Sequence, residues 1–423
     1  MANSDVLIVG AGIFGVSTAY YLSLSLPDAS RVTVLDRAPV PSRQAASTDI
    51  NKIVRADYSK AFYMDLAYEA LDLWTKEAWL QEHFHQTGWV ALDEKGSDLS
   101  QRIRALFKQS GRPDTSADIS LQEVKSNWGA VLSGINTDGF DKAYTNSSAG
   151  WANASSAVRA MMQRAIENGV KYQVGEADEL VYSKNQVSVR TTDGQTHTGA
   201  KVLLATGAWT PWLMASLESA LSIPPDRSIN KQVQAAGVCV AAFRLSEPES
   251  QHYGHMPVLI YGGQGEVLPP TDEQLFKFTN SNTFRNTQPH PCGREISVPA
   301  TDQHSIPASL KAESLDIIRQ RVPEILADHP EPSEWRLCWD AVSPDQNQLI
   351  CQHPDPRLAN LYLATAGSFH SWKFLPVIGK YVANVLAGRS NGKEKDATWG
   401  WKTSFDSRGA HEKVLPRREL PRG

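Results

Sequence analysis

A short apolar run followed by a glycine-rich turn begins the chain. Residues 6–9, Val-Leu-Ile-Val, are too few for a helix and are ended by glycine, so they predict a buried strand. Residues 14–24 then predict a helix, and residues 31–35, Arg-Val-Thr-Val-Leu, predict a second strand that closes with Asp36. This order of strand, turn, helix and strand is typical of a βαβ unit.

Helical and strand periodicities alternate along the rest of the chain. Apolar residues recur at helical spacing in several segments, and Gly169 is placed to cap one of these helices. Short apolar or alternating runs bounded by turn residues predict strands. The predicted helices are residues 62–79, 99–111, 120–128, 154–168, 308–322 and 376–386. The predicted strands are residues 171–174, 179–182, 186–191, 195–197, 201–205, 232–243, 258–261, 265–268 and 275–279.

Strand-rich segments in the middle of the chain separate two regions that alternate strands and helices. A chain of 423 residues is long enough for about two or three domains, and we expect two that are interleaved in sequence. A dinucleotide-binding domain is predicted from residues 1–80, 145–220 and 330–390, and a substrate domain from residues 81–144 and 221–329. Residues 391–423 are polar and rich in Lys and Arg, which predicts a loosely ordered tail.

The glycine-rich turn carries the spacing of a dinucleotide fingerprint. Gly10 permits a tight turn, Gly12 permits close approach of a pyrophosphate, and Gly15 lets the helix pack on the strand. Asp36 lies about 20 residues beyond, where a carboxylate can accept a hydrogen bond from a ribose hydroxyl. Gly207, just after the predicted strand 201–205, marks a second place where the backbone can pass close to a dinucleotide. The pattern predicts a bound adenine dinucleotide and leaves NAD and FAD open.

Composition narrows the possible partners and the compartment. The formal charge is −4 and no Lys/Arg cluster suggests a basic groove, which argues against a nucleic-acid partner. The four cysteines show no CxxC spacing, so we expect neither a disulfide framework nor a metal site, and a reducing compartment fits better. We find no signal peptide, no membrane span and no C-terminal peroxisomal signal, and therefore expect a cytoplasmic protein.

Seven spaced motifs between residue 5 and about residue 388 carry a family resemblance. Through them the chain resembles the fructosyl amino acid oxidases (amadoriases) within the monomeric sarcosine oxidase family. The motifs are Asp49-Ile-Asn-Lys-Ile-Val, Phe84-His-Gln-Thr-Gly, Ser148-Ala-Gly-Trp-Ala, Leu337-Cys-Trp, Pro344-Asp345, His353-Pro and Gly367-Ser-Phe-His-Ser-Trp-Lys-Phe-Leu-Pro-x-Ile-Gly.

The resemblance implies both a fold and an activity. The fold is α/β, with a Rossmann-type FAD-binding domain interleaved with a strand-rich α+β substrate domain. The activity is oxidation of the secondary-amine C–N bond of a small amino-acid derivative by FAD, through hydride transfer to flavin N5 and hydrolysis of the imine. Oxygen then reoxidises the flavin and yields hydrogen peroxide. The resemblance further implies a monomer that needs no metal.

Two residues are singled out for the flavin itself. The resemblance implies that Cys338 attaches FAD covalently as a thioether, whereas the sequence alone favours a buried structural cysteine. It also implies that Lys277 lies over the flavin and activates oxygen. That role is physically coherent, because a fixed positive charge stabilises an anion forming beside reduced flavin. The alternative for Lys277 is the solvated face of an edge strand.

Other residues are implied for the substrate and for the rest of the cofactor. Lys373 would bind the substrate carboxylate, and it stands near a helix start, where the macrodipole does not favour a cation. Lys52 would hold a water or substrate group, whereas Asp49 in the same motif is expected to pair locally. Arg55 is a second candidate contact for carboxylate or phosphate, and His370 is placed on the substrate side. The implied cofactor contacts are Gly10, Gly12, Ile13, Phe14, Gly15, Asp36, Arg37, Asp49, Lys52, Ala205, Gly207, Trp209, Cys338, Gly367, Phe369, His370 and Lys373.

The sequence departs from the family pattern after Lys277. Fructosyl oxidases carry Cys-Asp-Glu there, and the glutamate anchors the substrate, whereas this chain has Thr279-Asn-Ser281. Losing a charge-assisted hydrogen bond costs about 1.5–3 kcal/mol, enough to change substrate preference. The alternative substrate is therefore an N-alkyl amino acid such as saccharopine, pipecolate, sarcosine or another N-methyl amino acid. A flavin dehydrogenase or a non-catalytic FAD-binding protein is a further alternative.

Overall fold

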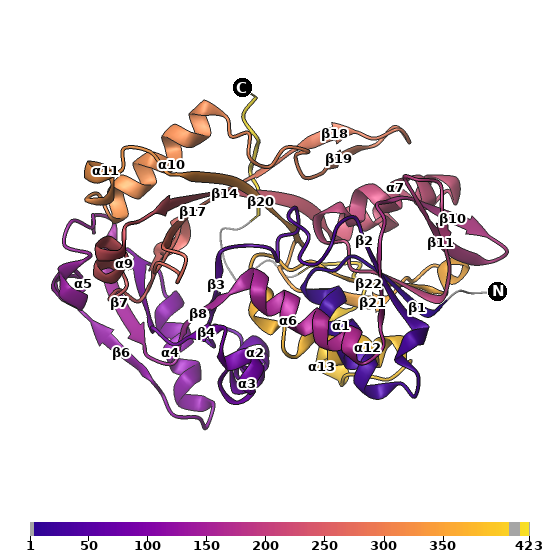
Figure 1. The fold of residues 1–423 in the computed structure, drawn as a ribbon, viewed down its shortest axis with the longest axis horizontal. Coiled ribbons are helices and arrows are strands. Elements are labelled where there is room, and N and C mark those ends of the chain that lie inside the picture. Colours follow the sequence, from indigo (N-terminus) through magenta and orange to yellow (C-terminus); the bar gives the residue numbers. More distant parts are fainter. Residues whose placement is uncertain (1–3, 406–414, 423) are drawn as a thin grey trace.

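The computed structural model describes residues 4–405 and 415–422. Two lobes are joined by long strands that run between them (Figure 1). One lobe holds β1, β2, β21 and β22, and the other holds β6, β7 and β17. The strands of the two large sheets alternate along the sequence, because the chain passes repeatedly from one lobe to the other.

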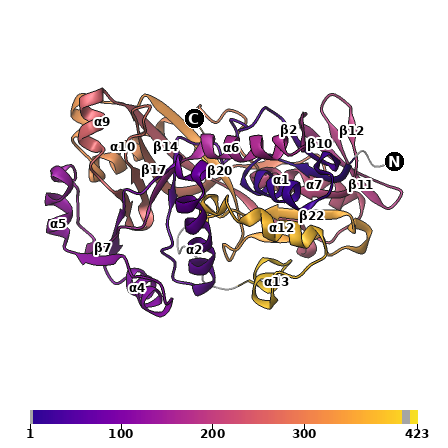
Figure 2. The ribbon, with the colours of Figure 1, turned by 60° about the horizontal axis from the view of Figure 1, so that its bottom comes forward.

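The first large sheet carries the predicted βαβ unit. Its strands pair in parallel except for the edge strand β21, which is antiparallel to β22. Strands β1, β2 and β22 are almost continuously buried, as expected of a sheet covered by helices, whereas the edge strand β9 is largely exposed. Helix α1 (Ile13–Ser25) packs between α6 (Ala154–Glu167) and α12 (Ile378–Leu386), as Figure 2 shows. In spatial order the strands are β21 (Leu349–Gln352), β22 (Leu361–Thr365), β13 (Gly199–Leu204), β1 (Ser4–Val9), β2 (Val32–Asp36) and β9 (Lys171–Val174).

The second large sheet is mostly antiparallel and forms one wall of the site described below. Its β14 and β17 are both long, and their central residues are buried on both faces. In spatial order the strands are β20 (Glu334–Val342), β14 (Gln234–Arg244), β17 (Leu275–Arg285), β16 (Gly265–Leu268), β15 (Val258–Tyr261), β5 (Trp89–Glu94), β7 (Phe140–Asn146) and β6 (Ser116–Ile119).

Smaller sheets and further helices complete the described part of the chain. The short strands are β3 (Asn51–Val54), β4 (Phe84–His85), β8 (Gly150–Asn153), β10 (Ala177–Ser183), β11 (Gln186–Thr191), β12 (Thr196–His197), β18 (Thr287–Pro289), β19 (Glu295–Ser297) and β23 (Arg418–Glu419). The remaining helices are α2 (Ala61–Lys76), α3 (Ala78–Gln81), α4 (Leu99–Gln109), α5 (Leu121–Ser126), α7 (Thr210–Ala220), α8 (Ile229–Gln232), α9 (Glu247–Tyr253), α10 (Ala308–Arg321), α11 (Ile325–Asp328) and α13 (Lys393–Trp399). Within the described ranges, the search for a helix long and apolar enough to cross a bilayer finds none.

Several predicted elements are confirmed to the residue. Strands β9, β11, β15 and β16 have the predicted bounds, and Gly169 caps α6 with a φ of +108°. The predicted helix 62–79 is wrong in one respect. The extended backbone of Glu77 (ψ 114°) separates α2 from α3, and Leu80 on α3 packs into the core. The boundaries of the two interleaved domains stay a prediction.

Strand β17 is six residues longer than predicted, because it runs to Arg285 instead of ending at residue 279. The residues that follow, Asn280 and Ser281, are polar. Asn280 is in fact buried and donates from Nδ2 to Glu313 Oε1 at 2.8 Å, while Ser281 lines a cavity on the other face. The polar side chains therefore have partners on both sides of the sheet, and the strand can continue.

The prediction of a loosely ordered tail is wrong for the described residues beyond 390. Helix α13 brings Trp399 into the core, where it is 1 % exposed and donates from Nε1 to Gln348 Oε1 at 3.0 Å. Strand β23 pairs in parallel with β17. Arg408 lies outside the described residues. The tail sequence is polar on average, so its single buried indole did not stand out from its composition.

Trp399 is expected to contribute strongly to stability. The substitution Trp399→Ala removes a fully buried indole and its hydrogen bond, so we expect the free energy of unfolding to fall by about 3–5 kcal/mol. Urea denaturation followed by circular dichroism measures the loss. The exposed Glu394 on the same helix provides the control Glu394→Ala, expected to change stability by less than about 0.5 kcal/mol. Equal stability of the two variants would show that α13 does not anchor the tail.

Candidate active site

The turn after β1 has no space for side chains at Gly10 and Gly15. A Cβ atom on Gly10 would lie 2.4 Å from the carbonyl oxygen of Ala205, and Gly10 has a φ of +103°. A Cβ atom on Gly15 would lie 1.9 Å from the carbonyl oxygen of Gly10, so α1 could not pack on β1 with any larger residue. At Gly12 a Cβ would meet only the Ser47 hydroxyl, at 3.4 Å. The backbone of Gly12 therefore faces open space, as a pyrophosphate cradle requires.

The carboxylate of Asp36 braces this turn. Its Oδ2 accepts a hydrogen bond from the Ala11 backbone N–H at 2.6 Å, and its Oδ1 accepts one from Ala38 at 3.3 Å. Burial raises the pKa of Asp36 above its usual value. The same side chain lines the cavity, so it is placed to meet a ribose as well as to hold the turn.

A long cavity of about 2120 Å³ starts at this turn and continues between the two large sheets. Its length and its glycine-lined end fit an adenine dinucleotide. Gly15 lies behind the wall, where the packing role predicted for it places it. The other predicted site residues line the cavity: Gly10, Gly12, Ile13, Phe14, Asp36, Arg37, Asp49, Lys52, Arg55, Ala205, Gly207, Trp209, Lys277, Ser281, Cys338, Gly367, Phe369, His370 and Lys373.

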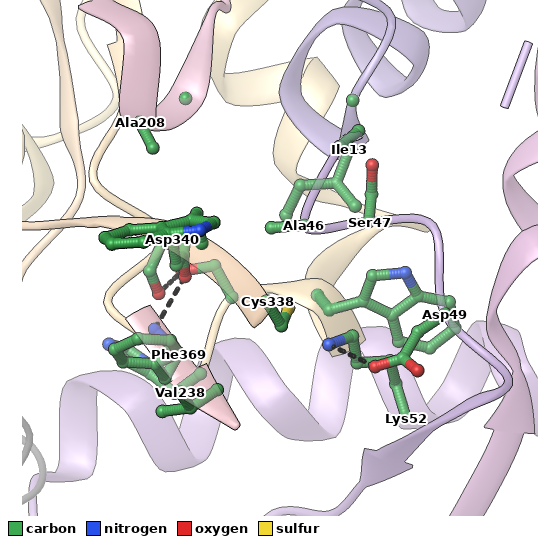
Figure 3. A pocket seen from close by; sticks show the side chains of 18 of the residues that line it. Ile13, Ala46, Ser47, Asp49, Lys52, Ala208, Val238, Cys338, Asp340 and Phe369 are labelled. Atoms are coloured by element: carbon green, nitrogen blue, oxygen red, sulfur yellow. Dashed lines mark hydrogen bonds and ion pairs between the residues drawn. The ribbon is translucent and has the colours of Figure 1, made fainter. Parts of the chain in front are cut away.

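Cys338 lies on the wall formed by the second sheet. It sits on β20 opposite Val238 of β14, is 3 % exposed, and faces the same cavity as Val238 and Val240. Figure 3 shows Cys338 between two interactions. One is the hydrogen bond from the Phe369 backbone N–H to Asp340, and the other is the ion pair of Asp49 with Lys52. The thiol is therefore buried in protein yet directed toward the space a cofactor would fill.

Lys277 lies in a group of three charges beside Cys338, in which Lys277 and Asp49 are buried and Lys52 is half-buried. Its Nζ donates to Asp49 Oδ2 at 2.8 Å and to the Asn51 carbonyl oxygen at 2.8 Å. Lys52 Nζ reaches the same carboxylate oxygen at 2.8 Å. Burial alone would raise the pKa of Asp49, but attraction to the two lysines outweighs it and lowers that pKa well below its usual value. The group carries one net positive charge inside the protein.

Two sequence-based alternatives are resolved by this group. Lys277 is 1 % exposed on β17, a central strand between β14 and β16, so the alternative of a solvated edge strand is wrong. Asp49 was expected to pair locally. It does so with Lys52, and it also pairs with Lys277, which lies 228 residues away along the chain.

Lys373 is buried without an acidic partner among the ion pairs of the described residues. Its Nζ donates to the carbonyl oxygen of His370 at 2.6 Å and to the Tyr58 hydroxyl at 3.1 Å. Burial, followed by repulsion from Arg55, holds the pKa of Lys373 well below its usual value. The nearby Arg55 guanidinium lies over the rings of Tyr58 and Trp89, at 4.6 and 4.9 Å from their centroids. An anionic ligand group at this end of the cavity would be attracted by both cations.

His370 is held neutral in the loop before Lys373. Its Nε2 donates to the Gln346 carbonyl oxygen at 2.8 Å, which leaves Nδ1 to accept from the Tyr58 hydroxyl at 3.1 Å. Burial, and then the charge of Lys373, lowers the pKa of His370 to about 3. His370 therefore orients Tyr58 and the loop through hydrogen bonds instead of contributing a charge.

The loop that carries these residues has an unusual backbone. Ala366, Ser368 and Phe369 have φ values of 62°, 49° and 59°, in the left-handed region that non-glycine residues rarely adopt. The half-buried carboxylate of Asp340 holds this conformation by accepting from the Phe369 backbone N–H at 2.7 Å. Asp340 was not predicted as a site residue. Its position two residues after Cys338 on the same strand face was the available signal.

Asp57 is a second site residue that was not predicted. It is 1 % exposed, and its carboxylate accepts from Asn146 Nδ2 at 3.0 Å and from the Tyr144 hydroxyl at 3.2 Å. Burial raises the pKa of Asp57 to about 6. Its backbone carbonyl oxygen accepts a hydrogen bond from Arg55, so Asp57 helps to hold that guanidinium in place.

Comparison with known proteins extends the sequence resemblance. Residues 5–385 match the family described as DAO, FAD dependent oxidoreductase. The chain is 28 % identical to L-saccharopine oxidase of Schizosaccharomyces pombe, covering 95 % of this chain and 93 % of that protein. The structure of fructosyl peptide oxidase from E. terrenum superposes with a TM-score of 0.83 at 26 % identity, covering 99 % and 96 % of the two chains. Amadoriase I from Aspergillus fumigatus superposes with a TM-score of 0.77 at 27 % identity, covering 95 % and 90 %.

Proposed function

Because the chain belongs to the family of FAD dependent oxidoreductases, we propose that it oxidises the C–N bond of an N-substituted amino acid with oxygen as electron acceptor. The observation that carries this proposal is the charged group of Lys277, Asp49 and Lys52 beside Cys338 in the cavity. The positive charge of this group would stabilise an anion formed during oxygen reduction beside it.

Bound FAD would supply a two-electron acceptor for the amine carbon and would pass the electrons to oxygen. The Gly10 turn and Asp36 would hold the adenine end, and the Asp340-braced loop would border the other end. We further propose that Cys338 forms a thioether to the cofactor. Support comes from its burial on the cavity wall, where it faces the space that the cofactor would fill.

The substrate end of the cavity is built from this chain's own charges. Arg55 and Lys373 would bind the α-carboxylate of the substrate and so orient the carbon next to nitrogen. The positive charges of Lys52 and Lys277 beside Cys338 disfavour an ammonium at a reacting nitrogen bound next to them. The amine would therefore bind in its neutral form, whose lone pair is available to support loss of a hydride.

Two classes of substrate fit this arrangement. A fructosyl amino acid is one, on the evidence of the structural neighbours. An N-alkyl amino acid such as saccharopine, pipecolate or sarcosine is the other, supported by Ser281 in place of an acid and by the similarity to a saccharopine oxidase. We also propose a monomeric enzyme, since both large sheets that line the cavity belong to one chain, and a cytoplasmic location, which the four free cysteines favour.

Peroxide release tests the activity. The purified protein is supplied with fructosyl-valine, fructosyl-lysine, sarcosine, pipecolate and saccharopine in turn, and flavin absorbance and hydrogen peroxide are recorded together. We expect at least one amine to bleach the flavin under nitrogen and to yield peroxide in air. Bleaching without peroxide would indicate a dehydrogenase. Neither bleaching nor peroxide with any amine would indicate a protein that only binds FAD.

The pH dependence tests the role of Lys373. A carboxylate substrate needs the charged form of this lysine, so kcat/KM is expected to fall about tenfold for each pH unit above the lowered pKa of Lys373. The substitution Lys373→Arg keeps the charge to higher pH and should move this alkaline limb upward, at some cost in maximal rate. A pH profile measured from pH 6 to 10 that is identical in the two proteins would assign the limb to another group.

A further inference from the structure

Glu266 lies in the middle of the second large sheet, on the face that forms one wall of the cavity. The strand registers place one residue from each of six neighbouring strands in a single row across this face. The row is Val240 of β14, Thr279 of β17, Glu266 of β16, Ile260 of β15, Ala91 of β5 and Tyr144 of β7, and all six line the cavity. Glu266 is the one charged residue in this row.

The backbone around Glu266 is held rigidly. Gly265 has a φ of +131°, and a Cβ atom there would lie 2.1 Å from the carbonyl oxygen of Thr279, so β16 is pressed against β17. The fully buried guanidinium of Arg321 donates to the carbonyl oxygens of Gln264, Glu266 and Thr279 at 2.6, 3.2 and 2.8 Å. These contacts use backbone oxygens and leave the Glu266 carboxylate directed toward the cavity.

The Glu266 carboxylate has unused hydrogen-bonding capacity. Among the described residues it accepts one side-chain hydrogen bond, from the Thr279 hydroxyl at 3.3 Å, and takes part in no ion pair. Asp49, Asp57 and Asp340, which line the same cavity, each accept at least two. Glu266 lies near enough to Lys52 and Lys373 to interact with their charges. It therefore borders the space between the two lysines and the hydroxyl groups of β17.

We propose that Glu266 determines substrate specificity by binding a hydrogen-bond donor, hydroxyl or ammonium, on the N-substituent of the substrate. This inference rests on the proposed amine oxidase function and deepens it. The substrate class is an amino acid whose nitrogen carries a polyhydroxy or amino-bearing chain, in preference to a plain N-alkyl group. Ser281 lies two residues beyond Thr279 on the strand next to β16. The acid absent from position 281 is thus replaced from the neighbouring strand.

The proposal predicts a substrate-dependent loss of activity. A charge-assisted hydrogen bond at this site corresponds to about 10–100-fold in kcat/KM. For saccharopine, which carries a second ammonium, both Glu266→Gln and Glu266→Ala are expected to lose that factor. The hydrogen-bond donors of fructosyl-valine are hydroxyls, from which glutamine can still accept. For this substrate only Glu266→Ala should lower kcat/KM. Sarcosine carries only an N-methyl group, so both variants should stay within about threefold of the wild type.

The holoenzyme is tested with these three compounds, and kcat and KM are measured separately. Glu273→Gln makes the same change on an exposed residue between β16 and β17, and should leave all three values unchanged. The double variant Glu266→Gln/Ser281→Glu returns an acid to the neighbouring strand and should recover about tenfold of the loss on saccharopine. Recovery would exclude a general folding defect as the cause of the loss.

Two results would overturn the proposal. One is an equal loss on sarcosine and on the donor-bearing substrates, which would place Glu266 at the part common to all three. The other is no loss on either donor-bearing substrate in Glu266→Ala. If the wild type oxidises none of the compounds, the amine oxidase proposal fails, but the proposal for Glu266 can still be tested by binding. Dissociation constants from perturbation of the flavin spectrum by the same compounds then decide whether Glu266 binds the donor.

Discussion

Replacement of Lys277 by methionine is expected to slow reoxidation of the reduced enzyme by oxygen by about 10²–10³-fold, the range found when one preorganised charge or donor is removed from a developing anion. The buried ammonium is held by Asp49 and the Asn51 carbonyl oxygen, so its charge is fixed before the reaction starts. Methionine has a similar length and no charge. Stopped-flow mixing of anaerobically reduced enzyme with oxygen measures the rate directly.

The reduction step provides an internal comparison. Lys277 is not assigned to the carboxylate of the substrate, so the rate of flavin reduction under nitrogen is expected to change by less than about tenfold. The exposed Lys142 on β7 of the same sheet provides the control Lys142→Met, for which both rates should match the wild type. A Lys277→Met enzyme that reacts with oxygen at the normal rate would assign oxygen activation to Lys52 or another group.

The second large effect concerns the attachment of the cofactor. In the wild type we expect the yellow flavin to stay with the protein after acid precipitation, whereas Cys338→Ser is expected to release all of it to the supernatant. A serine hydroxyl has a far higher pKa than a thiol and is a poor nucleophile under the same conditions. Absorbance of pellet and supernatant, together with the mass of the intact protein, measures the linkage.

Cys351→Ser is the matched control for this experiment. Cys351 lies on β21 of the first sheet and does not line the cavity, so this variant should retain flavin as the wild type does. Release of flavin from the wild type itself would show that Cys338 is a structural cysteine facing a non-covalent cofactor. Retention by Cys338→Ser would place the attachment at a different residue.

The βαβ unit was predictable because its signals are local. Strand length, the spacing of Gly10, Gly12 and Gly15, and the closing Asp36 all lie within a few dozen residues, and the physical reason for each can be stated from the sequence. The same holds for β15 and β16, where short apolar runs are bounded by turn residues. Local periodicity thus predicts elements well where both the strand and its ends are marked by composition.

The arrangement of the site depends on long-range pairing. Asp49 and Lys277 form their ion pair across 228 residues of sequence, and only the register of β17 against β14 and β16 turns Lys277 toward Asp49. The family resemblance implied roles for both residues without indicating that their side chains form an ion pair. Glu266 carried no motif at all, because its importance comes from its neighbours on two other strands. The burial of Trp399 was not predicted, because a single indole hardly changes the average polarity of the tail.

The interleaving of the two sheets also bears on how the protein is made. In the first sheet, β13 pairs with β1 and then with β22, whose residues 361–365 come late in synthesis. Until they emerge, one edge of β13 is unpaired, and such an edge can associate with other chains. Contacts between distant segments also form slowly. We therefore expect cofactor capture after the chain is complete, and a yield of active enzyme that depends more on chaperones during synthesis than on the final stability of the fold.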